Sequence, residues 1–164
     1  MKIEGKVIKY GNNVNTDEII PAKYLNISDP ELLGKYCFSG LDKNFIEKVN
    51  QGRNIIVAGD NFGCGSSREH AAVSIKASGI KCIIAESFAR IFFRNSINIG
   101  LPIVELKYAT EKISFDDELK IDFDNGKIEN ITKKEFYDIV PFPIFMKKII
   151  DAGGLIQYLK THRR

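Results

Sequence analysis

The sequence predicts an α/β domain in which parallel strands alternate with helices. Short apolar runs typical of buried strands occur at residues 54–58 and 81–85, and each is followed by a segment with the apolar spacing of a helix. Nearer the C-terminus, Asp124-Asn125-Gly126 separates two strand-like segments, as in a β-hairpin. Because a helix that crosses between two strands of one sheet leaves them parallel, we expect a parallel sheet first and an antiparallel addition after it.

The expected elements follow one another along the whole chain. A first strand, Lys6–Tyr10, ends at Gly11, and a long segment from Val14 to Gly40 follows it with little apolar periodicity. A loop of this length in a compact domain usually has a function. The remaining expected elements are short helices near 31–35 and 44–48, a strand at 54–58, a helix from the Ser66 turn to Gly79, a strand at 81–85, a helix at 88–96, a strand within 98–106, strands at 118–123 and 127–131, and a helix at 144–152.

Length and composition favour a single globular domain spanning residues 1–164. The 164 residues are 44% hydrophobic and 27% charged, which is enough apolar material for a proper core. The formal net charge of +3 is small and spread along the chain, so we expect no nucleic-acid partner. No apolar run reaches the length of a membrane span, and the first residues lack the apolar region of a signal peptide. We therefore expect a cytoplasmic protein without a membrane partner.

Residues Gly59–Ala72 carry the strongest functional signal. Their sequence, GDNFGCGSSREHAA, places glycines at a strand-to-helix turn. Ser66 and Glu69 have the spacing of a capping box, in which the Ser66 hydroxyl accepts a hydrogen bond from the Glu69 amide. Two serine hydroxyls and the Arg68 guanidinium would then gather where free amides and the helix dipole favour an anion. The pattern predicts a small anionic ligand, and its alternative is a purely structural helix cap.

Known glycine-rich motifs do not fit this turn. A Walker A loop needs a lysine after the glycines, and a dinucleotide fingerprint needs a third glycine where Arg68 stands. A nucleophile elbow needs the order Gly-x-Ser-x-Gly, which residues 63–67 lack. The turn is therefore an anion-binding serine turn of another kind.

The three cysteines do not form a local metal or disulfide motif. Cys37, Cys64 and Cys82 are far apart in sequence, no pair has the Cys-x-x-Cys spacing, and the chain has only two histidines. An odd number of cysteines fits a reducing compartment better than a disulfide scaffold. We expect no metal or cofactor in this chain. Cys64 is either a reactive thiol or a small side chain that the tight turn tolerates.

Several motifs, in order along the chain, resemble one protein family. Residues 63–71, GCGSSREHA, resemble the active-site loop of the swivel domain in the aconitase superfamily. One branch of that superfamily, the small subunit of isopropylmalate isomerase, is similar to this chain in the motifs at 15–25 (NTDEIIPAKYL), 85–95 (AESFARIFFRN), 98–102 (NIGLP), 141–143 (PFP) and 153–156 (GGLI). The resemblance covers essentially the whole chain.

The resemblance implies a fold, an activity and a partner. The fold is the swivelling β/β/α domain, here with a C-terminal β-hairpin and helix. The activity is that of a hydro-lyase in leucine biosynthesis, which converts 2-isopropylmalate to 3-isopropylmalate by dehydration and rehydration through 2-isopropylmaleate. The superfamily uses a 4Fe–4S cluster as the Lewis acid. Because this chain has no clustered cysteines, the cluster is expected on a large partner subunit, in a heterodimer or heterotetramer, and the small-molecule substrate is a hydroxy diacid.

Four residues are implied in the chemistry by the resemblance. Ser66 corresponds to the base that removes a proton next to a carboxylate, and Ser67 and Arg68 correspond to groups that hold a substrate carboxylate. Asp17 matches an acidic active-site position, with an Asx turn as its alternative. A serine alkoxide needs the amides and dipole of a helix N-terminus in a closed, dry cleft.

A second region is implied in substrate choice. In the resembled family, the loop that corresponds to Tyr24-Leu25-Asn26-Ile27 contacts the variable group of the substrate, and an arginine there favours an additional carboxylate. This chain has the neutral Asn26 and the apolar Ile27 instead. A buried carboxylate without a countercharge is costly, so an isopropyl group is the expected guest. The alternative is that Asn26 only caps the following turn.

Two other functions remain open at this point. The chain could be the small subunit of homoaconitase or of a hydro-lyase acting on citramalate or 2,3-dimethylmalate, and the residues around Tyr24 distinguish these. It could also be an anion-binding module without catalysis, which the intact Ser66, Ser67 and Arg68 argue against.

The aromatic helix at 88–96 raises a separate question. Phe88, Ile91 and Phe92 are expected in the core. Arg90 and Arg94 lie four residues apart on one face, where they either form local salt bridges or face a partner subunit.

Overall fold

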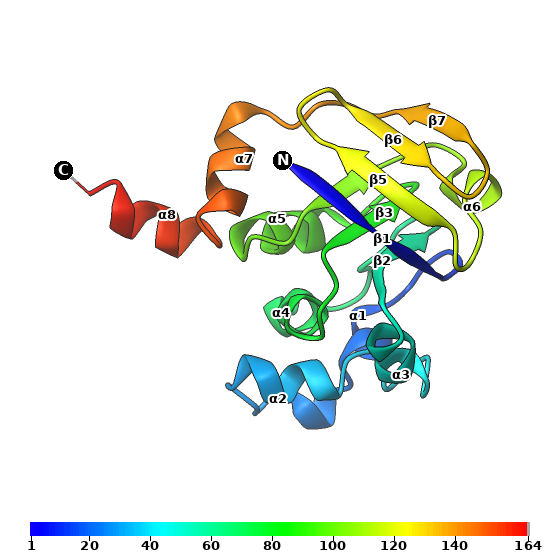
Figure 1. The fold of residues 1–164 in the computed structure, drawn as a ribbon. Helices are drawn as coiled ribbons and strands as arrows, with labels where there is room; N and C mark the ends of the chain where they lie inside the picture. The colour runs from blue at the N-terminus through cyan, green and yellow to red at the C-terminus, as the bar shows by residue number, and fades with distance from the viewer. Residues whose placement is uncertain (164) are drawn as a thin grey trace.

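The computed structural model describes residues 1–163 and contains a seven-stranded sheet in the order β4-β3-β2-β1-β5-β6-β7 (Figure 1). The strands are β1 (Lys2–Lys9), β2 (Arg53–Ala58), β3 (Cys82–Ala85), β4 (Ile103–Glu105), β5 (Glu118–Asp122), β6 (Lys127–Asn130) and β7 (Glu135–Asp138). Strands β1 to β4 pair in parallel, whereas β5, β6 and β7 add to β1 in antiparallel fashion. The expected α/β fold with an antiparallel addition is confirmed.

Most helices cover one face of the sheet. The helices are α1 (Thr16–Ile19), α2 (Pro30–Lys35), α3 (Phe45–Asn50), α4 (Glu69–Ala77), α5 (Arg90–Asn98), α6 (Ala109–Lys112), α7 (Ile144–Asp151) and α8 (Leu155–Thr161), with a 3₁₀ turn, η1, at Ala22–Tyr24. Buried side chains of α2, α3, α4, α5 and α7 belong to one hydrophobic cluster, and Ala109 of α6 belongs to the other. The parallel strands are therefore covered on both sides.

The parallel strands alternate between these two clusters residue by residue. Ile55 and Val57 of β2 pack with the α6 side, and Ile56 and Ala58 pack with the α4 and α5 side. All four side chains are fully buried. Because β2 is buried on both faces, its sequence is a continuous apolar run rather than an alternating one. This agrees with the buried strand that the sequence predicted at 54–58.

Several short elements were not predicted from the sequence, because their conformation depends on contacts with the rest of the fold. Helices α1 and α6 have four residues each, too few for an apolar period to appear, and α8 was also not expected. Strand β7 was missed because its sequence, EFYD, is mostly exposed and acquires its strand conformation by pairing with β6. The predicted boundaries of the other elements differ from the observed ones by a few residues.

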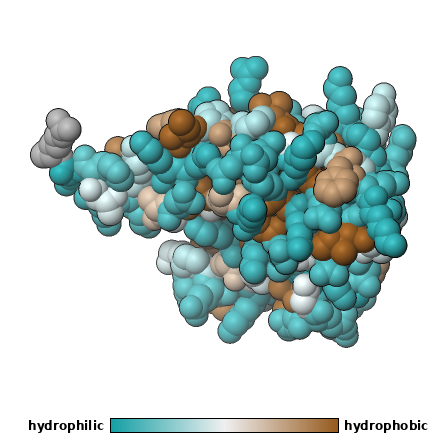
Figure 2. Space-filling view, turned by 45° about the horizontal axis from the view of Figure 1, so that its top comes forward, coloured by the Kyte–Doolittle hydropathy of each residue, from teal (hydrophilic) through white to brown (hydrophobic). Residues whose placement is uncertain are grey.

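The C-terminal helix α8 projects from the main body, although Leu155 and Tyr158 pack partly buried against the core. It has no buried residue among Leu155–Thr161, and the ribbon view shows it extending away from the sheet (Figure 1). The space-filling view shows the same arm projecting from a largely hydrophilic face with scattered apolar patches (Figure 2). Across the part of the chain that the structure describes, we find no helix with the length and apolarity needed to span a bilayer.

Gly63, in the turn between β2 and α4, allows this turn to lie directly against α5. Its φ of +81° falls in the left-handed region, and a Cβ placed there would lie 2.2 Å from Cγ of Phe92. Phe62, the preceding residue, has its ring 5.3 Å from the ring of Phe92 and 6.0 Å from that of Phe88, both edge-on. The turn and α5 are thus packed together by aromatic contacts that leave no room for a side chain at residue 63.

We predict that Gly63→Ala lowers the free energy of unfolding by about 1–3 kcal/mol, because overpacking adds to backbone strain. Gly52→Ala is the matched control, since Gly52 has a φ of +94° but a Cβ placed on it would have no atom within 4 Å. Urea unfolding of the two variants and the wild type measures the difference. Equal destabilisation by both substitutions would show that backbone strain alone accounts for the effect and that the contact with Phe92 adds nothing.

Candidate active site

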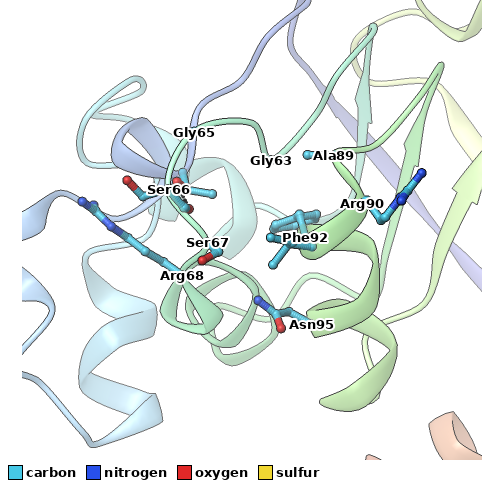
Figure 3. Close-up of a pocket in the computed structure, with 11 residues that line it drawn as sticks. Gly63, Gly65, Ser66, Ser67, Arg68, Ala89, Arg90, Phe92 and Asn95 are labelled. Atoms are coloured by element: carbon cyan, nitrogen blue, oxygen red, sulfur yellow. Dashed lines mark hydrogen bonds between the residues drawn. The ribbon is translucent and has the colours of Figure 1, made fainter.

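The glycine–serine turn and the start of α5 enclose a pocket at the carboxyl ends of two parallel strands. The turn follows β2, and residues 86–89 lead from β3 into α5. The pocket has a volume of about 210 Å³ and lies between the serine turn and α5 (Figure 3). Its lining residues are Thr16, Gly63, Gly65, Ser66, Ser67, Arg68, Ala89, Arg90, Ile91, Phe92 and Asn95.

The predicted capping box of Ser66 and Glu69 is wrong. Helix α4 begins at Glu69, its N-cap is Arg68 in an extended conformation, and no side chain caps it. Ser66 and Ser67 lie before the helix, in the turn itself. The local capping tendency is overridden by hydrogen bonds from a distant segment, as the next contacts show.

The segment around Thr16 holds the turn in place. The Thr16 amide donates to the Cys64 carbonyl at 2.8 Å, and the Thr16 hydroxyl donates to the Ser66 carbonyl at 2.8 Å. The Gly63 amide donates to the Val14 carbonyl at 2.8 Å. Beside these bonds, Cys64 forms an isolated β-bridge with Asn15, and residues 63–66 are not part of helix α4. Thr16 is 1% exposed and was not predicted as part of the site, although it lies in the motif at 15–25.

Ser66 and Ser67 present their side chains to solvent. Both residues are exposed, and within residues 1–163 neither hydroxyl makes a hydrogen bond. The Thr16 bond uses the backbone carbonyl of Ser66, so the Ser66 hydroxyl stays available. The structure thus brings the two serines to one pocket wall with free donor and acceptor capacity.

Arg68 extends from the pocket wall toward Asp17. Its side chain is 17% exposed, and its guanidinium forms an ion pair with the Asp17 carboxylate, which is 56% exposed. It also lies 3.5 Å from the Ile20 carbonyl, to which it donates. In Figure 3 the guanidinium points away from Phe92. A guanidinium has five N–H donors, so a second carboxylate can bind beside Asp17.

Asp17 is positioned by a capping box at α1 that was not predicted from the sequence. The Asn15 side chain accepts from the Asp17 amide at 2.9 Å, and the Glu18 carboxylate accepts from the Asn15 amide at 2.9 Å. The spacing Asn-x-x-Glu was a usable signal for this start. The Asx turn therefore belongs to Asn15, and the Asp17 carboxylate remains free to pair with Arg68.

Helix α5 supplies the opposite wall. Phe92 is buried, whereas Ile91 is 50% exposed, so the expectation that Ile91 lies in the core is wrong. Asn95 is half-buried, and its amide points from α5 toward Ser67 (Figure 3). Asn95 was not predicted as a site residue from the sequence.

Two helices begin at this pocket without a capping side chain. The N-caps are Arg68 for α4 and Ala89 for α5, and neither side chain accepts from the helix. No side chain of the described residues therefore accepts a hydrogen bond from the first amides of either helix, and both helix dipoles direct positive potential toward the cavity. This arrangement favours an anion, and two such ends suit a ligand with two negative charges.

The loop Tyr24–Ile27 does not line this pocket. The Tyr24 ring stacks on that of Tyr36 with centroids 4.1 Å apart, and Leu25 and Ile27 pack partly buried against the core. Asn26 is exposed. Within the described residues, the chain by itself leaves this loop outside the walls formed by the serine turn and α5.

The cysteines lie in three different environments. Cys37 and Cys82 are buried in the clusters on opposite faces of the sheet, and Cys64 is half-buried in the glycine turn. Burial raises the pKa of Cys37 to about 12 and also raises the pKa of Cys82, so both remain protonated thiols. Across residues 1–163 no three His, Cys, Asp or Glu side chains are grouped so that they could hold a metal ion.

The chain is similar to known proteins over nearly its whole length. Residues 2–109 match the aconitase C-terminal domain family. The chain is 59% identical over 161 residues to a 3-isopropylmalate dehydratase small subunit of Ruminiclostridium cellulolyticum, covering 98% of both chains. It is 60% identical over 159 residues to the protein of the same name from Endomicrobium trichonymphae, covering 97% of both chains.

Solved structures agree with the sequence comparison. The crystal structure of a 3-isopropylmalate dehydratase from Methanocaldococcus jannaschii matches with a TM-score of 0.91 and 45% identity, covering 98% of this chain and 95% of that one. Aconitase X of Thermococcus kodakaraensis, at 18% identity and a TM-score of 0.50, shares the fold alone. The swivel-domain fold implied by the motifs is confirmed, and the chain belongs to the 3-isopropylmalate dehydratase small-subunit family and carries the aconitase C-terminal domain.

Proposed function

We propose that this chain, as one domain spanning residues 1–164, is the small subunit of a two-subunit hydro-lyase of the cytoplasm. With a large subunit it interconverts 2-isopropylmalate and 3-isopropylmalate through 2-isopropylmaleate, a step of leucine biosynthesis. The observation that carries the proposal is the pocket in which Ser66, Ser67 and Arg68 meet two uncapped helix N-termini, in a chain of this family. That pocket suits a dianionic hydroxy diacid.

The 4Fe–4S cluster expected for this chemistry does not fit the residues of this chain. Such clusters need three or four cysteine thiolates in one place. Here Cys37 and Cys82 lie on opposite faces of the sheet with raised pKa values. We therefore assign the cluster to the large subunit and derive no step through it from this chain.

The serine turn supplies the base and the carboxylate site. Ser66 takes the proton from the carbon next to a substrate carboxylate, and the free amides at the start of α4 stabilise the negative charge that the serine oxygen carries. Ser67 and Arg68 hold the carboxylate, with Asp17 as the acidic residue that orients the guanidinium. Because Ser66 is exposed, this chemistry requires the large subunit to cover the pocket and exclude water.

We predict that the isolated chain has no dehydratase activity and that adding the cluster-bearing large subunit creates it. The reason is that this chain holds the base and carboxylate site but not the Lewis acid. An anaerobic assay for 2-isopropylmaleate formation measures both samples, with the large subunit alone as a control. Turnover by the single purified chain would contradict the proposal. A complex that prefers homoaconitate, citramalate or 2,3-dimethylmalate would reassign the substrate.

Ser66→Ala is predicted to lower kcat of the complex by about a hundredfold or more, because general-base catalysis contributes about 10²–10⁴-fold. Folding should be unaffected, since the Thr16 hydroxyl bonds to the backbone carbonyl that alanine retains. Ser67→Ala is the matched control and should mainly raise KM. Steady-state kinetics with circular dichroism melts separate the two effects. Near-native turnover of Ser66→Ala would remove the serine from the proton transfer.

Arg68→Lys is predicted to raise KM about tenfold while kcat changes less. Lysine keeps the charge beside Asp17 but loses the planar fork that binds a carboxylate with two hydrogen bonds. Initial rates over a range of 2-isopropylmalate concentrations give both constants. If KM stays at the wild-type value, the substrate carboxylate binds elsewhere.

Asn26→Arg is predicted to raise activity toward tricarboxylic substrates relative to 2-isopropylmalate. An arginine at this exposed position adds a countercharge for a distal carboxylate, which neutral Asn26 does not provide. The ratio of kcat/KM values for homoaconitate and 2-isopropylmalate measures the change. An unchanged ratio would indicate that residues outside the loop Tyr24–Ile27 determine substrate selectivity. That outcome would agree with the position of this loop outside the pocket walls of the single chain.

A further inference from the structure

The outer face of α5, beside the pocket, carries two positive charges, Arg90 and Arg94, that form no ion pair within the described chain. Arg90 is the first residue of α5, where the positive end of the helix dipole disfavours a cation. Arg94 follows one turn later, where two like charges repel each other. The first turn of α5 contains no acidic residue and no side chain caps it. Within residues 1–163, the arginines that form ion pairs are Arg53 and Arg68.

These arginines flank an exposed apolar side chain. Arg90 and Arg94 are exposed, and Ile91 between them is 50% exposed and borders the pocket. The Arg90 side chain points away from Ser66 and Ser67 (Figure 3). Although Arg90 lines the pocket, its guanidinium is therefore directed away from the two serines in the single chain.

We propose that Arg90, Ile91 and Arg94, called here the α5 strip, bind the large subunit. Acidic side chains of that subunit pair with the two arginines, and an apolar side chain covers Ile91. The inference rests on the proposed function, in which the large subunit covers Ser66. The strip adjoins the pocket, so a partner that closes over Ser66 and Ser67 also meets α5.

The local electrostatics explain why the partner is acidic. A cation at a helix N-terminus and an unshielded like-charged pair both oppose folding of the isolated chain, and natural sequences retain such conflicts mainly where function requires them. An acidic surface relieves both at once, because it neutralises the pair and complements the free amides of the first turn. A second copy of this chain would bring arginines against arginines if the strip paired with itself.

The test uses the full-length chain and the purified large subunit. The wild-type complex is formed first, because failure of the wild type to bind would contradict the proposed function itself. Arg90→Glu and Arg94→Glu are then compared with the control Lys134→Glu, which is an equal charge reversal at an exposed residue. Lys134 lies between β6 and β7, at the edge of the sheet opposite to β4. Calorimetric titration at several salt concentrations gives each Kd, and thermal melts give the stability of each variant.

We expect Arg90→Glu and Arg94→Glu each to raise Kd for the large subunit at least tenfold and to reduce the salt dependence of Kd. Lys134→Glu should leave Kd at the wild-type value. Arg90→Glu should melt at the same temperature as the wild type or higher, because an acid suits the helix N-terminus. If Arg90 had only a structural role in this chain, Arg90→Glu would instead lower the melting temperature and leave Kd for the large subunit unchanged. An unchanged Kd in both variants overturns the proposal. An unchanged Kd with a raised KM also overturns it, because the arginines would then face the substrate.

Discussion

The candidate site depends on the hydrogen bonds that join Thr16 to the serine turn. Two bonds of 2.8 Å, from the amide and the hydroxyl of one buried residue, fix the carbonyls of Cys64 and Ser66. Without them the local sequence favours a helix that starts at Ser66, with its hydroxyl used as a cap. The long-range contact instead delays the helix to Glu69 and leaves both serine hydroxyls free. Tertiary structure thus converts a structural capping sequence into a site with unused hydrogen-bonding capacity.

The architecture was predictable because its signals are local and repeated. Buried parallel strands such as β2 and β3 are continuous apolar runs, and Asp124-Asn125-Gly126 marks the turn between β5 and β6. The gathering of Ser66, Ser67 and Arg68 at one turn was also predicted from their order in the chain, and all three line the pocket. These features need no knowledge of distant contacts.

The remaining features were not predictable because they depend on what folds against them. Ser66 has the sequence of a cap, and only the contact with Thr16 removes it from that role. Ile91 fits the apolar face of a helix, yet the pocket opens beside it and leaves it half exposed. The pairing of Asp17 with Arg68 joins residues 51 positions apart, which no spacing rule within one element describes. Tertiary geometry decides each of these cases.

The close packing of Phe62, Phe88 and Phe92 has a mechanical consequence. Gly63 lies against Phe92 with no space between them, and the Phe62 amide and carbonyl bond to Ser87 and Ala89 at 3.0 and 2.9 Å. Within the described residues, the serine turn and α5 are therefore packed together as one unit at this point. In the complex proposed above, opening and closing of this pocket would then depend on movement of the whole domain relative to the large subunit rather than on a loop between these two walls.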